Sequence, residues 1–235
     1  MKIRAWRWAF IAPLTIAALG ANAQTGGQPE AGQQLGQIKQ AMAENRAKLQ
    51  KYQWIESTEV SIKGDTKKDE QNACRYAADG TVQKTPIGPP PPPPKEPPRG
   101  LRGRVVEKKV GEMKEYMERL KSLIGHYAPP DPEKMQQSFQ AGKATLNGAG
   151  GAASLTFHDY YKQGDQVTLS FDKAAKRLTN FDVNTYLDSP QDVVTLTNQF
   201  ATLPDNTNYL QQTTITSKSK QIEIKKTNSQ YTPIP

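Results

Sequence analysis

The residue types that most often carry catalysis are scarce in this chain. Its only histidines are His126 and His158, and its only cysteine is Cys74. The two histidines lack the close spacing of metal ligands or of an acid–base pair. His158 is followed by Asp159, but neighbours on a strand point to opposite faces of the sheet. We therefore expect surface histidines, no metal, no cofactor and no enzyme activity.

Cys74 lacks the surroundings of a reactive thiol. A nucleophilic cysteine needs a nearby base or cation that lowers its pKa, and Arg75 is its only charged neighbour in sequence. A lone cysteine forms no intrachain disulfide, so we interpret it as a passive, half-buried strand residue. The glycine-rich stretch 147–151 lacks the Lys-Ser/Thr pair of a phosphate loop, and we expect a flexible turn there.

The first 23 residues are typical of a secretory signal. Three basic residues precede an apolar stretch over 10–19, and Ala21-Asn22-Ala23 forms the small-x-small site that signal peptidase cleaves. The apolar stretch is shorter than the roughly 20 residues that span a bilayer. We therefore expect a periplasmic or secreted protein that begins at Gln24, with no transmembrane anchor in the mature chain.

Removal of this signal leaves 212 of the 235 residues, enough for one domain with a sizeable core. The signal contains three of the 31 basic residues and none of the 23 acidic ones, so the net charge falls from +8 to about +5. This excess is mild, and no series of aromatic residues accompanies the basic segments, which argues against nucleic acid as a partner. A lipid or lipoprotein and an envelope protein remain candidate partners, and peripheral membrane contact remains open.

The elements that must position any site begin after a Gln/Gly-rich stretch over 24–33, which predicts a disordered leader. Helical spacing of apolar residues predicts an amphipathic helix over 34–51. From Tyr52 the period changes to two and predicts a strand, whose apolar face is interrupted by Glu56. A second strand is expected over 68–77, and Asp79-Gly80 predicts a tight hairpin into 81–84.

A proline-rich segment at 86–98 contains six consecutive prolines. Such a run removes backbone donors and favours an extended polyproline conformation, so we expect a stiff, exposed loop. It is either a spacer or a ligand for a proline-recognition protein.

A long helix is predicted over 104–124, because apolar residues recur there at steps of three and four. This apolar stripe is either ordinary core or one wall of a ligand groove, since two of its members are methionines and Tyr116 lies on or beside it. A short second helix is expected over 133–141, with Asp131 or its neighbour as the N-cap. The stripe consists of Val106, Val110, Met113, Met117, Leu120 and Ile124.

The last third of the chain predicts a series of antiparallel strands separated by turn residues. Apolar and polar residues alternate in several of them, as in a sheet with one buried face. The sequence therefore predicts an α+β fold, in which helices pack across the concave face of a curved antiparallel sheet that forms an incomplete barrel. We expect one domain over 34–228 and a C-terminal tail over 229–235. The strands are expected at 152–161, 166–172, 177–187, 193–200, 208–217 and 221–227.

This layout resembles the periplasmic outer-membrane lipoprotein carrier and sorting superfamily over residues 34–228. The resemblance lies in the segments Tyr52-Gln53-Trp54 and Thr58-Glu59-Val60, the hairpin over 75–81 and the strand-rich second half. It implies an incomplete β-barrel closed by helices, whose hollow shields acyl chains, in members that act as lipid carriers or as sensors. The resemblance is one of pattern, so no individual residue is carried over.

We therefore expect an exported binding protein that holds an apolar ligand, a lipid or a lipoprotein acyl chain, between the sheet and the long helix. Burial of ligand hydrocarbon would drive binding, at about 0.8 kcal/mol per CH₂ group. The alternative is an envelope protein-interaction or sensor module without a lipid ligand. The candidate lining residues are Trp54, Val60, Ile62, Met113, Met117, Phe157, Leu169, Phe171, Phe181 and Val183.

Overall fold

The computed structural model describes residues 40, 43–88, 101–148, 150–175 and 177–234. The expected signal, the leader and all but the first three residues of the segment 86–98 lie outside this range. Within it, residues 43–49 are helical, in agreement with the helix expected over 34–51. No helix in the described part of the chain is long and apolar enough to cross a membrane.

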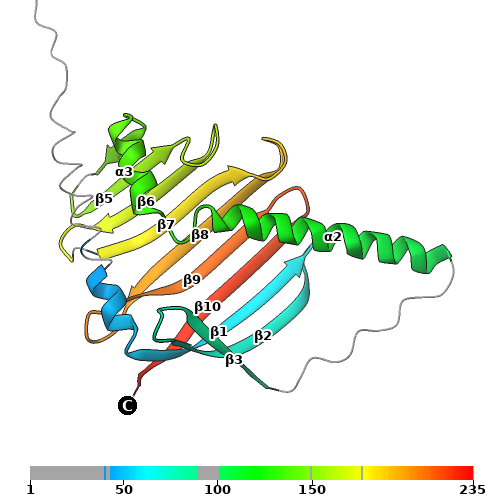
Figure 1. The fold of residues 1–235 in the computed structure, drawn as a ribbon, viewed down its shortest axis with the longest axis horizontal. Coiled ribbons are helices and arrows are strands. Elements are labelled where there is room, and N and C mark those ends of the chain that lie inside the picture. The colour runs from blue at the N-terminus through cyan, green and yellow to red at the C-terminus, as the bar shows by residue number, and fades with distance from the viewer. Residues whose placement is uncertain (1–39, 41–42, 89–100, 149, 176, 235) are drawn as a thin grey trace, which may run out of the picture.

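A single open, antiparallel sheet of ten strands dominates the described chain (Figure 1). Its strand order is β3-β2-β1-β10-β9-β8-β7-β6-β5-β4. The strands are β1 (Tyr52–Ile62), β2 (Asp65–Tyr76), β3 (Val82–Ile87), β4 (Ala144–Asn147), β5 (Ala152–His158), β6 (Gln166–Asp172), β7 (Arg177–Tyr186), β8 (Val193–Thr202), β9 (Asn208–Ser217) and β10 (Ile222–Pro233).

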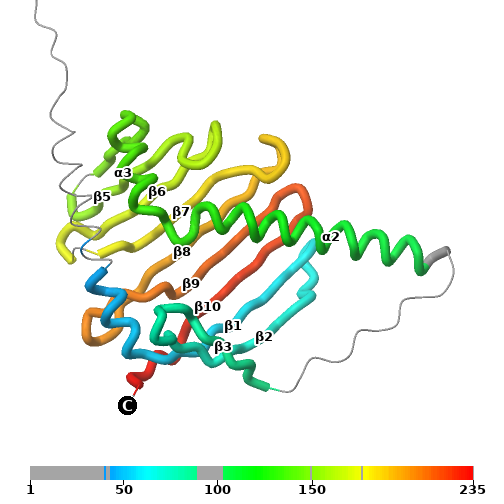
Figure 2. The backbone as a smooth tube through the Cα atoms, in the orientation of Figure 1, coloured from blue at the N-terminus to red at the C-terminus, as the bar shows by residue number. Residues whose placement is uncertain are grey.

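Two meanders make up the sheet, and the pairing of β1 with β10 joins them. Every neighbouring pair except this one consists of strands that follow one another in the chain. The first and last strands therefore lie side by side in the interior of the sheet (Figure 2). The sheet depends on a contact between residues almost two hundred positions apart, such as Tyr52 with Pro233.

Helices α2 (Leu101–Gly125) and α3 (Pro132–Gln140) lie on one face of the sheet, which we call the helix side (Figure 1). The expectation for α3 is confirmed, because the Asp131 side chain accepts hydrogen bonds from the backbone N–H groups of Glu133 and Lys134 at its N-terminus. The second half of α2 packs on the sheet. Its first half extends beyond the sheet, and every residue from 104 to 110 is exposed (Figure 2).

The hydrophobic core lies between the second half of α2, α3 and strands β5 to β10. The α2 residues buried in it are Tyr116, Leu120 and Leu123, with Tyr127 just after the helix. The expected stripe is therefore partly wrong. Only Leu120 of its six members is fully buried, and the buried face is rotated by about one residue toward the tyrosines.

Several strand boundaries differ from expectation. β2 begins at Asp65, β3 runs on to Ile87, and the short strand β4 is additional. β10 continues to Pro233, so most of the segment expected as a C-terminal tail is strand. The reason is that β10 is central, and the start of β1 supplies hydrogen-bonding partners to its last residues.

Candidate functional site

A group of polar side chains lies buried on the helix side of β1 and β2. Glu56 on β1 is only 9% exposed and stands opposite Asn72 of β2, which is also buried. Thr58 is the next residue of β1 on the same face and is buried as well. Trp54 precedes Glu56 on this face and carries a polar N–H group. Three consecutive side chains on this face of β1 therefore need hydrogen-bonding partners.

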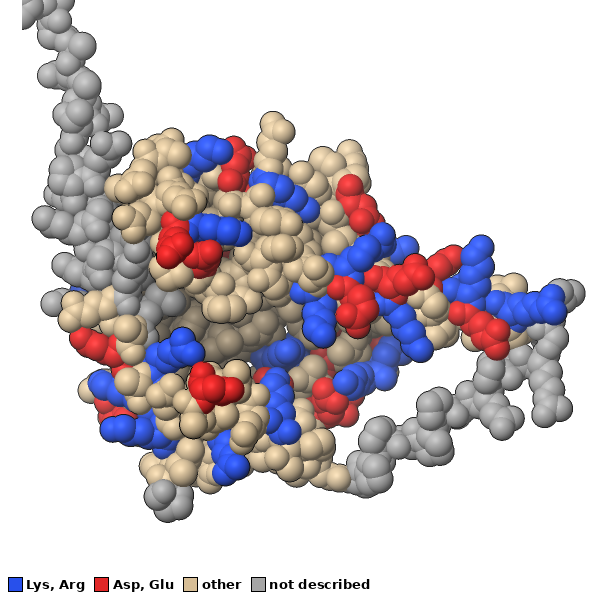
Figure 3. All heavy atoms as spheres, viewed as in Figure 1, with Lys and Arg blue, Asp and Glu red and all other residues tan. Residues whose placement is uncertain are grey.

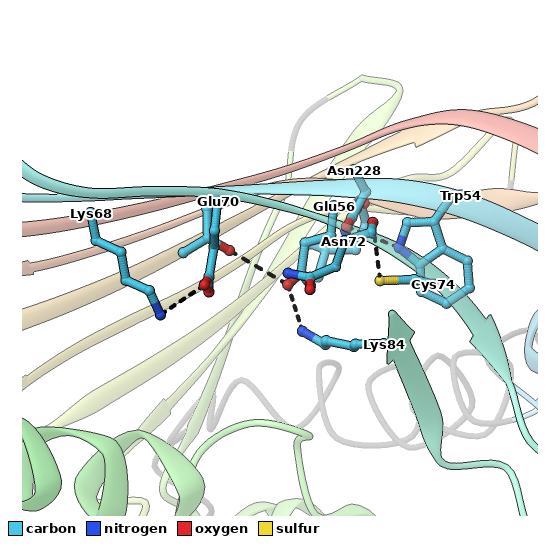
Figure 4. Close-up of polar contacts among 10 residues, drawn as sticks. Trp54, Glu56, Lys68, Glu70, Asn72, Cys74, Lys84 and Asn228 are labelled. Carbon is cyan, nitrogen blue, oxygen red and sulfur yellow. Dashed lines mark hydrogen bonds and ion pairs between the residues drawn. The ribbon is translucent and has the colours of Figure 1, made fainter. Parts of the chain in front are cut away.

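Lys84 of β3 supplies the charge partner of Glu56. Its Nζ lies 2.5 Å from Oε1 of Glu56, although Lys84 is paired across the strands with Cys74 and lies two strands away (Figure 4). The contact requires the β2–β3 hairpin to curl over the helix side of the sheet. An exposed lysine thus ties the edge strand to a buried carboxylate in the sheet interior.

Aromatic rings form one wall beside this ion pair. The Trp54 ring stacks on Tyr231 with centroids 5.5 Å apart and planes 9° apart, and it contacts Tyr76 at 5.2 Å. Tyr231 in turn contacts Tyr209 at 4.5 Å. The Trp54 indole N–H donates to Oδ1 of Asn228, 3.1 Å away, so its polar group is satisfied (Figure 4).

A β-bulge in β10 places Tyr231 in this wall. The register of β10 against β1 shifts between Gln53 and Ile55, and Gln230 has a φ of 54° there. The extra residue changes the alternation, so that Asn228 and Tyr231 both lie beside Trp54. We call the resulting group the polar cluster. It comprises Trp54, Glu56, Thr58, Asn72, Cys74, Tyr76, Lys84, Asn228 and Tyr231.

The protonation of the cluster follows from burial. Burial raises the pKa of the Cys74 thiol, and the Glu56 carboxylate raises it further. Burial also raises the pKa values of Tyr76 and Tyr231. Cys74 is 2% exposed and its Sγ lies 3.7 Å from the Asn72 carbonyl oxygen. It is a strand residue as expected, but a fully buried one, and its thiol is protonated at neutral pH.

The apolar side of α2 borders the same face of the sheet. Arg119 pairs with Asp188 in the β7–β8 turn at 3.3 Å. Met117 is two positions away, about 200° around the helix, so it lies on the opposite side of α2 from Arg119. Met113 shares that side, and both methionines are half-buried. The space-filling view shows a hollow below α2 on this side (Figure 3).

Two buried tyrosine–aspartate pairs hold α2 in this position. The Tyr116 hydroxyl contacts Ser217 Oγ at 2.5 Å and donates to Asp192 Oδ1 at 2.9 Å, at the ends of β8 and β9. The Tyr127 hydroxyl donates to Asp165 Oδ2 at 2.6 Å. These pairs fasten both ends of the buried half of α2 to strand ends. They are structural, because every polar atom in them is used within the fold.

The two histidines lie apart, and each interacts with a neighbouring hydroxyl group. His126 stacks on Tyr161 with centroids 4.0 Å apart, beside a shallow depression, and His158 contacts Thr145. Among the described residues, no group of three or more His, Cys, Asp or Glu side chains could hold a metal ion. The absence of enzyme activity stays a prediction.

The ten candidate lining residues fall into three groups. Phe157, Leu169, Phe181 and Val183 are fully buried in the packed core. Ile62, Met113, Met117 and Phe171 are half-buried at its margin, and Val60 is half-buried beyond it. Trp54 belongs to the polar cluster.

Sequence analysis missed most of the polar cluster. Two of its members had a signal in the sequence: Trp54 was a candidate lining residue, and Glu56 breaks the apolar face of β1 and needs a buried partner. Asn72, Lys84, Asn228 and Tyr231 come from three other strands. Only the pairing of β10, β1, β2 and β3 brings them together.

Comparison of the chain with known protein families finds no match, and comparison with curated proteins finds none either.

Proposed function

We propose that the protein is an exported, periplasmic binding protein for an amphipathic, lipid-like ligand. In this proposal the curved sheet is an incomplete barrel, and α2 and α3 lie across its concave face. The ligand occupies the part of that face between α2 and the polar cluster. The resemblance to lipoprotein carriers favours a lipid or a lipoprotein acyl chain as the ligand.

One observation carries the proposal. On the helix side, β1 changes from half-buried apolar residues near α2, Val60 and Ile62, to the buried polar and aromatic cluster at its other end. Met113 and Met117 of α2 pack, like Ile62, at the margin of the same core. Such a surface suits a molecule with a hydrocarbon chain at one end and a polar group at the other.

The packed core limits the length of the hydrocarbon chain of a ligand that the site can hold. Phe157, Leu169 and Phe181 fill the space under α3, so a ligand would lie along β1 and β10 rather than under the whole sheet. This shifts the proposed lining toward Trp54, Val60, Ile62, Met113 and Met117. The polar cluster would contact the head of the ligand through Lys84 and Asn72.

Trp54 offers a direct test, because it is the only tryptophan outside residues 1–23. Protein recovered from the exported fraction should release lipid on extraction. Titration of the delipidated protein with a lysophospholipid should change Trp54 emission. Met113→Lys should weaken binding by about tenfold, because it places a charge against the hydrocarbon. Val105→Lys adds the same charge on another side of the same helix and should leave affinity unchanged. No co-purifying lipid together with constant Trp54 emission would refute the proposal.

The second candidate, an envelope protein-interaction or sensor module, is supported by the exposed edge of the sheet. All six residues of β3 are exposed, and Val82 and Ile87 are among the exposed large apolar residues. An open edge strand can pair with a strand of another protein, and β3 leads into the proline-rich segment. Deletion of residues 86–98 should then abolish capture of the partner while the fold persists. Unchanged capture would count against this candidate.

A further inference from the structure

The first half of α2 is an exposed helix without a described partner surface. We call residues 104–112 the α2 overhang. Each residue from 104 to 110 is exposed, and Val105, Val106 and Val110 are 55%, 41% and 49% exposed. Val106 and Val110 lie one turn apart on one side of the helix and form an exposed apolar strip, whereas Val105 lies about 100° away around the helix.

The valines continue the apolar side of α2 that borders the proposed ligand site. Val106 and Val110 are one turn apart, and Met113 and Met117 follow at the same helical spacing. Lys109 and Lys114 flank this strip on its two sides, each 40° away or more at 100° per residue. The overhang is therefore a basic amphipathic helix.

Positive charge is concentrated around the overhang. Residues 101–114 of α2 contain five basic and two acidic residues, a net charge of +3. The whole chain after residue 23 carries only about +5, so more than half of its excess lies in these fourteen residues. Figure 3 shows Lys and Arg side chains, interspersed with Asp and Glu, along the projecting part of α2.

We propose that the α2 overhang docks on the surface of an anionic phospholipid bilayer. Val106 and Val110 enter the boundary between head groups and acyl chains, and the flanking Lys109 and Lys114 contact lipid phosphates. A membrane fits better than a protein partner because the overhang combines a narrow apolar strip with one sign of excess charge and projects away from the sheet. Docking goes beyond the proposed ligand binding, since it requires no bound ligand.

Vesicle co-sedimentation of the mature protein tests this docking. The protein should bind vesicles of phosphatidylcholine with phosphatidylglycerol more tightly than vesicles of phosphatidylcholine alone, and added salt should weaken binding. Val106→Asp with Val110→Asp should weaken binding by about tenfold or more. Val82→Asp with Ile87→Asp, a matched pair of exposed apolar residues on β3, should have no effect.

Reversal of lysine charges in the same vesicle assay provides a second test of the docking. Lys109→Glu with Lys114→Glu should lower affinity for the anionic vesicles by about tenfold or more. Lys173→Glu with Lys218→Glu makes the same change in net charge on exposed turns and should lower it much less. Absence of vesicle binding at low salt, or equal effects of the overhang and control variants, would overturn the docking. So would capture of a protein through the overhang without vesicle binding. Because these assays omit the ligand, their failure leaves the Trp54 titration unaffected.

Discussion

Individual side chains hold α2 in place on the sheet, and Tyr127 is an example. It is fully buried, and its hydroxyl lies between Asp165 Oδ2 at 2.6 Å and Thr185 Oγ1 at 2.8 Å. Asp165 also accepts hydrogen bonds from the backbone N–H groups of Tyr160, Tyr161 and Lys162. One carboxylate thus organises the β5–β6 turn and holds the chain just after α2.

Because the Tyr127 hydroxyl is buried, we expect the folded protein to lose stability at alkaline pH. Burial and the hydrogen bond to Asp165 raise its pKa above the usual 10.0, so the folded protein keeps a proton that the unfolded chain releases near that pH. This contribution is complete below pH 10 and is lost as the pH rises further. Tyr127→Phe should cost about 1–2 kcal/mol in urea unfolding at pH 7, and the difference from the native chain should shrink above pH 10. Tyr161→Phe, at an exposed position, is the control. An equal loss at both pH values would contradict this explanation.

We expect the aromatic wall around Trp54 to depend on the backbone angle of one residue, Gln230. Its φ of 54° lies in the left-handed region, which glycine adopts without strain and β-branched residues avoid. Gln230→Gly should keep the stability or raise it by about 0.5–1 kcal/mol. Gln230→Ile should lower the stability by about 1–2 kcal/mol and change Trp54 emission. If both variants had the same emission and melting temperature, the bulge would not position Tyr231.

At the scale of elements, α2 consists of two halves with different roles. Leu120 is 1% exposed and packs in the core, whereas Val110 lies in the overhang. Leu120→Ala should cost about 2–4 kcal/mol because it leaves a cavity, and Val110→Ala should stay within about 0.5 kcal/mol of the native chain. Urea unfolding of the two variants measures this difference. Amide hydrogen exchange should likewise be faster in 104–112 than in 116–124. Comparable losses in both variants would mean that the overhang packs on something within the fold.

The elements were predictable where the signal is local. β6 and β9 begin and end where expected, because alternation and turn residues mark both ends of each strand. The buried face of α2 was predicted less well, since the tyrosines that face the sheet were not counted as apolar. The polar cluster was not predictable beyond Trp54 and Glu56, because its other members meet them only through the pairing of β10, β1, β2 and β3 and the bulge at Gln230.

At the scale of the whole molecule, the β1–β10 pair joins two meanders that would otherwise be separate sheets. One meander runs from β1 to β3 and the other from β4 to β10. The polar cluster lies on this junction, since Trp54 and Glu56 come from β1 and Asn228 and Tyr231 from β10. The proposed ligand site therefore exists only when both ends of the described chain have folded together, and such non-local pairing is slow to form.

The last residues of β10 provide the test of this dependence. Removal of 229–235 would delete Tyr231 from the stack on Trp54 and remove the partners of Tyr52 and Gln53 on β1. We expect a loss of about 2–4 kcal/mol, since aromatic burial and strand pairing are lost together. Trp54 emission should shift to longer wavelength as water reaches the ring. Removal of 234–235 alone, beyond the end of the strand, should change the melting temperature little. Equal stability and equal Trp54 emission in the two truncated proteins would show that the last residues of β10 are a dispensable tail. The two meanders would then hold together without them.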